Sequence, residues 1–274
     1  MKIYDYDAVI IGSGCAGFNA ADCLYNNGIT NIALVAENIN YGTSRNAGSD
    51  KQTYYKLALS GKHDSVDDMA ESLFAGGSVD GDIALCEAAN SAYCFFKLVN
   101  LGMDFPKNEY GEYVGYKTDH DNSSRATSMG PFTSKIMTEC LQSSLKEKNA
   151  EIFDKLMAVE LITSDNKICG LLCLNLNKNI EDDDYFVLFI TDYVIMCTGA
   201  PANLYFDSVF PISQTGMSGM ALKAGAIFSN FNEWQYGLAS VKFRWNVSGS
   251  YQQVIPRYVS VDQFGNEREF YRII

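Results

Sequence analysis

The sequence predicts an α/β fold with a parallel sheet at its core. A short apolar run at Tyr6–Ile11 is typical of a strand that is buried on both faces. A helical pattern runs from Cys15 to Asn27 and ends at Gly28, and a second apolar strand follows at 31–36. The length of this unit suits a βαβ crossover, which makes its two strands parallel.

The chain between this unit and residue 150 is predicted to be mostly helical. The residues from 38 to 50 are small and polar and predict a loop, and those from 106 to 129 show little periodicity and predict irregular structure. Helices are expected at Val66–Ala75, with Ser65 as N-cap, at Ile83–Leu101, and from Thr133 to Lys148.

The chain then changes to strands, which predicts a β-meander inserted into the α/β domain. The run of acids from Glu181 to Asp184 in the last turn predicts a solvated hairpin tip. A further strand at Tyr193–Cys197 and a helix at Met217–Ala224 follow, and from about residue 230 the composition becomes aromatic and β-like. The meander strands are expected at Leu156–Thr163, Ile168–Leu176 and Tyr185–Ile190.

Composition narrows the range of functions. The chain has 274 residues and a formal net charge of −12, so neither nucleic acid nor an anionic membrane surface is an expected partner. No apolar run is long enough to cross a membrane, and the N-terminus does not resemble a signal peptide. The eight cysteines form no C-x-x-C pair, which predicts free thiols in a reducing cytoplasm. Only His63 and His120 are present, so no metal site is expected.

A glycine-rich turn stands between the first strand and the first helix. Residues Gly12–Gly17 read G-x-G-x-x-G: the first glycine permits a tight turn, the second lets backbone approach a diphosphate, and the third lets helix and strand pack closely. The N-terminus of the helix offers free N–H groups and a partial positive charge. Glu37 ends the second strand, where it can accept hydrogen bonds from a ribose. The pattern predicts a dinucleotide site, for either NAD or FAD.

Two further segments favour FAD. The loop Tyr41–Gln52 is dense in small residues and hydrogen-bond donors that can wrap closely around ribityl and isoalloxazine groups. The strand at Tyr193–Cys197 follows a meander and ends in the turn Thr198-Gly199-Ala200.

With these segments, the chain resembles the flavoprotein subunits of the succinate dehydrogenase and fumarate reductase family, which includes L-aspartate oxidase. The resemblance extends along the whole chain but corresponds to only the first half of such a subunit. It implies a Rossmann-like FAD-binding domain with a parallel sheet, a β-meander insertion and the beginning of a capping domain. The domain boundaries that it implies are 1–235 for the FAD-binding domain and 236–274 for the start of the capping, substrate-binding domain.

The resemblance also implies which residues bind the cofactor. Five segments match the family pattern in order. They are the glycine-rich turn, the acid that ends the second strand, the small-residue loop, a strand that flanks the adenine in the family, and the Thr-Gly turn. The implied residues are Gly12, Ser13, Gly14, Cys15, Ala16, Gly17, Glu37, Asn38, Thr43, Ser44, Asn46, Ala47, Gly48, Met157, Ala158, Thr198, Gly199 and Ala200.

Two departures from the family pattern matter. Members of membrane complexes link FAD to a histidine of the small-residue loop, and this loop has none, so FAD is expected to be non-covalent. Met217 stands where the family usually has an aspartate. The family's Arg and His residues that bind dicarboxylates and donate protons mostly lie beyond residue 274, so catalytic residues are not assigned. His120, Arg125, Arg244 and Arg257 are each open to a structural or an anion-binding interpretation.

The expected function is therefore that of an FAD-dependent oxidoreductase with hydride transfer at flavin N5. Its expected partners are FAD, a small-molecule substrate such as a carboxylate, and an electron-transfer subunit, with no nucleic acid and no membrane insertion. A flavin oxidase similar to L-aspartate oxidase and a non-catalytic flavin-binding subunit or remnant are the alternatives. An NAD-linked dehydrogenase is disfavoured by the two flavin-like segments.

Overall fold

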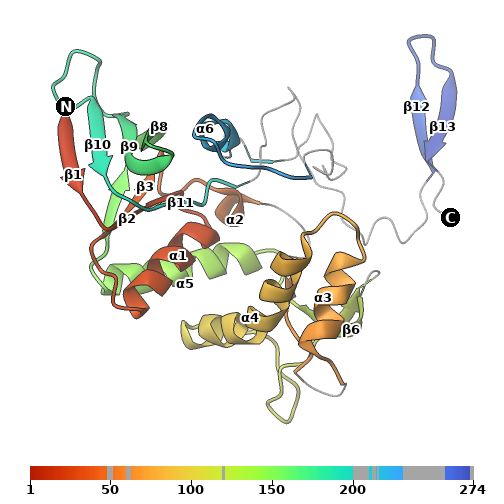
Figure 1. Cartoon of the computed structure of the whole chain (residues 1–274). Helices are drawn as coiled ribbons and strands as arrows, with labels where there is room; N and C mark the ends of the chain where they lie inside the picture. Colours follow the sequence, from red (N-terminus) through yellow and green to blue (C-terminus); the bar gives the residue numbers. More distant parts are fainter. Residues whose placement is uncertain are drawn as a thin grey trace.

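The computed structural model describes residues 1–47, 52–59, 63–118, 121–199, 210–211, 214, 216–230 and 257–271. Its centre is a parallel four-stranded sheet in the order β11-β2-β3-β7 (Figure 1). The strands are β2 (Ala8–Ile11), β3 (Ile32–Ala36), β7 (Glu151–Asp154) and β11 (Val194–Met196). Every neighbouring pair is parallel, which confirms the predicted fold class.

The two faces of this sheet are covered by different layers. Ile10 and Leu34 belong to a cluster with Phe18 of α1 (Cys15–Asn26) and Leu141 of α5 (Thr133–Glu147). Because side chains alternate along a strand, Val9, Ile11 and Val35 face the other way. They pack in a second cluster with the meander residues Leu171 and Phe189. Burial on both faces explains why β2 and β3 are continuous apolar runs.

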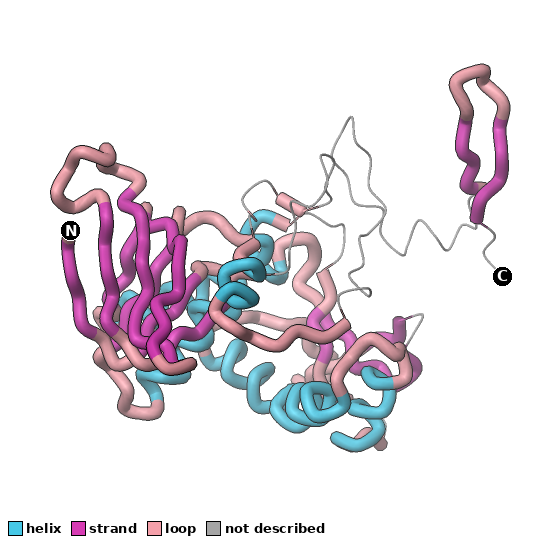
Figure 2. Tube along the Cα trace, turned by 45° about the horizontal axis from the view of Figure 1, so that its top comes forward, coloured by secondary structure: helices cyan, strands magenta, loops and turns pink. Residues whose placement is uncertain are grey.

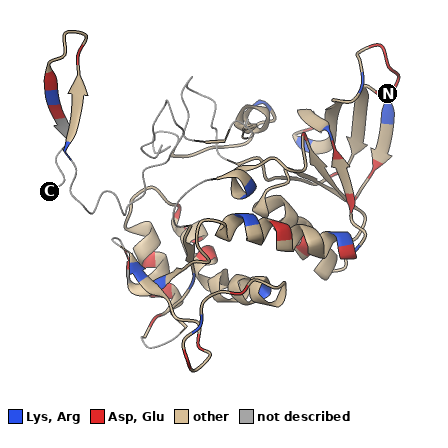
Figure 3. Cartoon of the chain, turned by 180° about the vertical axis from the view of Figure 1, so that it is seen from behind, with Lys and Arg blue, Asp and Glu red and all other residues tan. Residues whose placement is uncertain are grey.

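The second layer is a four-stranded sheet in the order β1-β10-β9-β8, in which only β1 and β10 run parallel (Figure 2). The acidic turn between β9 and β10 is exposed from Glu181 to Asp183, which confirms the predicted hairpin tip (Figure 3). The strands are β1 (Lys2–Asp5), β8 (Leu156–Ser164), β9 (Lys167–Asn175) and β10 (Phe186–Ile190).

Two further helices and a small antiparallel sheet lie on the helical side of the parallel sheet (Figure 1), where Phe95 and Leu98 belong to the same cluster as Ile10. Ser65 caps α3 (Val66–Phe74) by accepting a hydrogen bond from the Asp68 amide, as predicted, and Asp80 caps α4 (Gly81–Asn100) in the same way. The three strands of the sheet are β4 (Tyr54–Tyr55), β5 (Tyr116–Thr118) and β6 (Asp121–Thr127).

Several predictions about elements were wrong. The region from 106 to 129, predicted to be irregular, contains β5 and β6, and the loop from 38 to 50 contains a short helix, α2 (Thr43–Asn46). The strand predicted at Tyr6–Ile11 begins at Ala8, because the chain passes from β1 of the meander sheet into β2 of the parallel sheet at this point. The four-residue strand β7 was not predicted.

The last described elements are the predicted helix, α6 (Ser218–Lys223), and an antiparallel hairpin of β12 (Tyr258–Val261) and β13 (Glu267–Tyr271). Figure 1 shows the hairpin away from both sheets. Most of the segment assigned to a capping domain, 236–274, lies outside the described residues. No helix in the described part of the chain has the length and apolar character needed to cross a membrane.

A buried carboxylate joins α1 to two other helices. Asp22 is 1% exposed and accepts hydrogen bonds from Lys148 and Ser144 of the α5 region and from Lys97 of α4. Burial raises the pKa of Asp22, but these three hydrogen bonds outweigh it and lower the pKa to about 2.

This lowered pKa predicts an acid-dependent loss of stability. A depressed pKa stabilises the fold above the unfolded value near pH 4 and loses this contribution as the pH falls to about 2, a change of roughly 2–3 kcal/mol. Urea unfolding of the wild type and of Asp22→Asn should therefore show a difference in unfolding free energy that shrinks by about 2 kcal/mol between pH 5 and pH 2. A difference that does not change with pH would contradict the assignment.

Candidate functional site

The turn between β2 and α1 is shaped by the strand that lies beside it. Gly12 has a φ of +113°, and a Cβ there would lie 2.3 Å from the carbonyl oxygen of Cys197, just after β11. Two backbone hydrogen bonds hold this arrangement. The Gly12 amide donates to the Val35 carbonyl oxygen, and the Cys197 amide donates to the Ile11 carbonyl oxygen. Only glycine fits here, because both the backbone angle and the space exclude a side chain.

The other two glycines of the motif play different parts. A Cβ at Gly17 would lie 1.9 Å from the Gly12 carbonyl oxygen, so Gly17 lets the helix pack against the turn. Gly14 is the N-cap of α1 and has an ordinary extended backbone; a Cβ there would meet only the Ser44 hydroxyl, at 3.4 Å. The first turn of α1 has no N-cap side chain and no acid. The positive end of the helix is therefore available to an anion.

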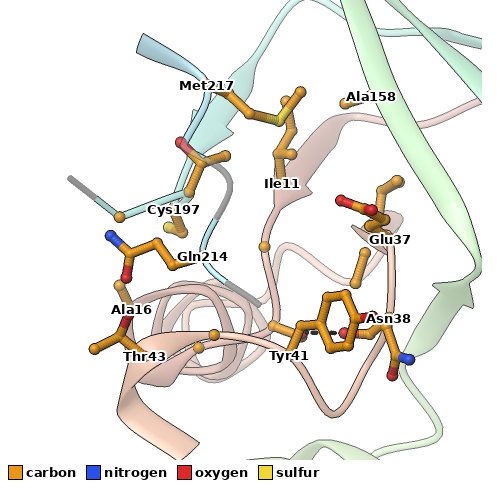
Figure 4. Close-up of a pocket in the computed structure, with 18 of the residues that line it drawn as sticks. Ile11, Ala16, Glu37, Asn38, Tyr41, Thr43, Ala158, Cys197, Gln214 and Met217 are labelled. Atoms are coloured by element: carbon orange, nitrogen blue, oxygen red, sulfur yellow. Dashed lines mark hydrogen bonds between the residues drawn. The ribbon is translucent and has the colours of Figure 1, made fainter. Parts of the chain in front are cut away.

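A cavity of about 170 Å³ opens at the carboxyl ends of β2, β3 and β11 (Figure 4). In doubly wound folds this edge is where ligands bind. The cavity is lined by the dinucleotide turn, the end of β3, the start of α2, the start of β8 and the Thr-Gly turn. The lining residues are Ile11, Gly12, Ser13, Gly14, Ala16, Val35, Ala36, Glu37, Asn38, Tyr41, Gly42, Thr43, Ser44, Leu156, Met157, Ala158, Cys197, Thr198, Gly199, Gln214 and Met217.

Glu37 and Asn38 follow the end of β3 and stand on one side of the cavity (Figure 4). The Asn38 carbonyl oxygen accepts a hydrogen bond from Ser13 Oγ at 3.1 Å, which joins this segment to the glycine turn. The Asn38 side chain accepts a hydrogen bond from the Asn40 amide, so it shapes the turn that follows.

The short helix α2 supplies hydroxyl groups to the opposite side. Thr43 Oγ1 is buried and has no hydrogen-bond partner in the described part of the chain. Ser44 Oγ accepts from the Cys15 amide at 3.3 Å. Gly42 has a φ of +95°, and a Cβ there would lie 3.4 Å from the Cα of Gly14, so the two glycines face each other closely.

Arg45 fixes α2 against α5. Its guanidinium donates to Gln142 Oε1 at 2.7 Å and pairs with Glu139 at 3.4 Å, and only 11% of its side chain is exposed. These contacts hold Thr43 and Ser44 at the edge of the cavity.

Most of the residues predicted to bind a cofactor come together in this cavity. The lining includes Gly12, Ser13, Gly14, Ala16, Glu37, Asn38, Thr43, Ser44, Met157, Ala158, Thr198 and Gly199. Gly48 and Ala200 lie outside the described residues.

Four other predicted residues do not line the cavity. The Cys15 thiol contacts the Thr138 hydroxyl at 2.9 Å, and burial raises its pKa. Gly17 packs on the turn, and the Asn46 side chain donates to the carbonyls of Asn40 and Gly42. Ala47 follows α2 as its C-cap.

The other lining residues were not among the predicted cofactor-binding residues, although Tyr41 and Gly42 belong to the loop that was predicted to wrap around the flavin. These residues are Ile11, Val35, Ala36, Tyr41, Gly42, Leu156, Cys197, Gln214 and Met217. Gln214 is distant in sequence from most of them, and a Cβ at Gly199 would lie 2.9 Å from its Nε2. Gln214 stands shortly before the helix predicted at Met217–Ala224, and this position in the sequence was the available signal.

Arg125 has a structural position. It is 3% exposed and forms a two-point ion pair with Asp64, through Nε at 3.0 Å and Nη2 at 2.7 Å. It does not line the cavity. Arg257 is exposed and lies 3.8 Å from Glu269. His120 and Arg244 lie outside the described residues.

Comparisons with known proteins agree with this geometry. The chain is 24% identical over 235 residues to an L-aspartate oxidase of Xylella fastidiosa, covering 83% of this chain and 43% of that protein. It is 26% identical over 210 residues to an L-aspartate oxidase of Clostridium acetobutylicum, covering 74% and 44%. The chain thus spans less than half the length of these relatives.

Solved structures show the same fold. A variant of the E. coli quinol fumarate reductase matches with a TM-score of 0.71 and 22% identity, over 81% of this chain and 37% of that chain. The open conformation of a flavocytochrome c3 fumarate reductase matches with a TM-score of 0.73 and 18% identity, over 92% and 46%. Residues 7–255 match the family described as FAD binding domain. The chain therefore belongs to the FAD binding domain family.

Proposed function

We propose that this chain binds FAD non-covalently and forms the flavin-binding part of an oxidoreductase. The observation that carries the proposal is the cavity itself, which lies at the ends of β2, β3 and β11 and collects residues from every segment that resembles the flavoprotein family. Family membership of residues 7–255 supports it.

The residues present suit the ADP part of FAD. The Cys15 amide donates to Ser44 Oγ, but no N-cap side chain covers the start of α1. Gly14 and Gly42 likewise place no side chain between a diphosphate and the backbone N–H groups of this turn. The buried Thr43 hydroxyl has no hydrogen-bond partner among the described residues, and a phosphate oxygen would satisfy it. The Glu37 carboxylate would accept hydrogen bonds from the ribose hydroxyl groups, and the Met157-Ala158 segment would flank the adenine.

The non-covalent attachment rests on the small-residue loop. In this loop, Gly42-Thr43-Ser44-Arg45 contains no histidine, and no histidine is among the described residues that line the cavity. We place the isoalloxazine ring near the Thr43–Gly48 segment and the Thr198-Gly199-Ala200 turn.

When bound, the flavin would supply hydride transfer at N5. This chain's own residues would hold and orient it: α2 is fixed by Arg45, and Gly12 and Gly199 let the backbone come close. We assign residues 1–235 to the FAD-binding domain and 236–274 to the start of a capping domain. We also propose that the protein acts on a carboxylate substrate, exchanges electrons with an electron-transfer subunit and is located in the cytoplasm.

A second candidate is a flavin oxidase, which is favoured by the similarity of this chain to two L-aspartate oxidases. Stopped-flow reoxidation of the photoreduced protein separates the two. Rapid reoxidation by oxygen supports the oxidase, whereas slow reoxidation supports an enzyme or flavin-binding subunit that passes electrons to another acceptor.

The first test is the visible absorption spectrum of the purified protein, with FAD added if the protein is colourless. We expect flavin bands that move to the supernatant after acid precipitation. Flavin that stays in the precipitate would contradict non-covalent binding. A folded sample that takes up no FAD would overturn the proposal.

The variant Gly14→Ala gives a sharper test of the same site. The backbone angles of Gly14 are ones that alanine adopts readily, so the variant should fold. The added methyl group would occupy the space needed by the diphosphate. We expect FAD affinity to fall about 100-fold with little change in Tm. Gly76→Ala is a matched control outside the cavity, where a Cβ would lie 3.6 Å from the Leu73 carbonyl oxygen, and it should leave affinity unchanged. Equal affinities of Gly14→Ala and wild type would exclude this diphosphate position.

A further inference from the structure

A cysteine and a lysine meet between α1 and α4, away from the cavity. The Nζ atom of Lys97 lies 3.3 Å from the Sγ atom of Cys23. Lys97 is also held by Asp22 Oδ2 at 2.8 Å and by Asn19 Oδ1 at 2.7 Å, and only 10% of its side chain is exposed. Neither Cys23 nor Lys97 lines the cavity, so this pair is independent of the proposed function.

We propose that Cys23 and Lys97 form an oxidation-dependent covalent bridge in which one oxygen atom joins Sγ to Nζ. Three features carry the proposal: the short distance between sulfur and nitrogen, the fixed position of the lysine, and the partial exposure of Cys23, which admits a small oxidant. A fixed pair of reacting atoms reacts faster than two mobile side chains.

The other partners of Asp22 allow the fold to remain stable when the Lys97 ammonium is lost. Asp22 is 1% exposed, and an unpaired carboxylate in such a position would be strongly destabilising. Here the same carboxylate also pairs with Lys148 and accepts from Ser144 Oγ at 2.6 Å. When Lys97 becomes part of a neutral bridge, Asp22 keeps one cation and one hydroxyl donor.

The reaction consumes two molecules of hydrogen peroxide. The first oxidises the thiol of Cys23 to a sulfenic acid and releases water. The second supplies the remaining two-electron oxidation as the sulfenic oxygen bonds to Nζ. In total, the thiol, the ammonium and two peroxides give the S–O–N bridge, three waters and one proton, which leaves to solvent. Sulfur and nitrogen each lose two electrons, and the two peroxides accept all four.

The reaction should be faster at alkaline pH. Burial lowers the pKa of Lys97, but the hydrogen bonds to Asp22 and Cys23 outweigh it and raise the pKa above its ordinary value. Lys97 is therefore an ammonium at neutral pH, and the neutral amine that bonds to oxygen becomes more abundant as the pH rises. The groups that face Nζ are Asp22, Asn19 and Cys23, with Lys148 on the far side of Asp22 and Cys94 one turn before Lys97 on α4.

Intact mass spectrometry of the full chain after peroxide treatment tests the proposal. We expect a gain of about 14 Da, the mass of one oxygen less two hydrogens, that dithiothreitol reverses. A tryptic digest should show a peptide pair joined through Cys23 and Lys97, with no cleavage after Lys97. The yield should rise at least threefold between pH 7 and pH 9.

Three variants isolate the pair. Cys23→Ser and Lys97→Arg should both abolish the gain, and Lys97→Arg keeps the positive charge beside Asp22, so it should remain folded. Cys86→Ser removes an exposed cysteine of the same helix and should leave the bridge intact. Cys94→Ser should also leave it intact. The proposal is overturned by a loss of about 2 Da that Cys94→Ser abolishes, which indicates a disulfide, or by oxygen atoms added to Cys23 alone with normal cleavage after Lys97.

Discussion

Replacing Gly12 by alanine is expected to abolish FAD uptake and to destabilise the fold by more than about 4 kcal/mol. The added methyl group would lie 2.3 Å from the Cys197 carbonyl oxygen, and the φ of +113° is itself unfavourable for alanine. The obstructing atom is backbone, and it belongs to the chain that leaves β11, so relief requires the separation of β11 from β2. Urea unfolding followed by circular dichroism, together with FAD titration, measures both effects.

Gly28→Ala is the matched control for this change. Gly28 also has a positive φ, +83°, but a Cβ there would have nothing within 4 Å. Its cost is therefore that of the backbone conformation alone, about 1–2 kcal/mol, and FAD uptake should persist. If the two variants lose similar stability, the close approach of Cys197 is not what requires glycine at position 12.

The second large effect is expected from Arg125→Met. The change leaves Asp64, whose side chain is 2% exposed, without its cationic partner, and removal of one member of a buried ion pair costs about 3–5 kcal/mol. Arg257→Met is the control, because that side chain is 66% exposed and its contact with Glu269 is 3.8 Å long. It should change stability by less than about 0.5 kcal/mol. Denaturant unfolding measures both variants.

The pH dependence of Arg125→Met should identify Asp64 as the cause. Burial raises the pKa of Asp64, but hydrogen bonds from Arg125 and from the Ala58 amide outweigh it and lower the pKa. Without Arg125, burial should raise this pKa above its ordinary value, so protonation at lower pH removes the unpaired charge. The stability difference between wild type and variant should shrink as the pH falls from 7 to about 4. A constant difference would indicate lost packing instead.

The sequence could predict the first βαβ unit because its signals are local. Strand periodicity, a glycine turn and a terminal acid all stand within the first 37 residues. The cavity residues from this unit follow from the same motif. Family resemblance extended the prediction to Thr43, Met157 and Thr198, which now line the cavity beside it.

The features that were missed depend on contacts between distant parts of the chain. The strand β6 pairs with β4, which includes only Tyr54 and Tyr55 and has no strand pattern of its own. Arg125 is structural because it meets Asp64, 61 residues earlier in the chain. Gln214 lines the cavity because it packs against Gly199, and its place before a predicted helix does not by itself predict that contact.

The pairing of β2 with β11 has a consequence for how the protein is made. The strand that carries the glycine turn is the second to leave the ribosome, yet one of its two neighbours is residues 194–196. The β2–β3 pair can form early, but the other edge of β2 stays open until residues 37–196 have also been synthesised. An open apolar strand edge is prone to wrong pairing, so the nascent chain is expected to need protection during this interval. The dinucleotide turn, encoded at the very start, would then take its final shape among the last parts of the domain.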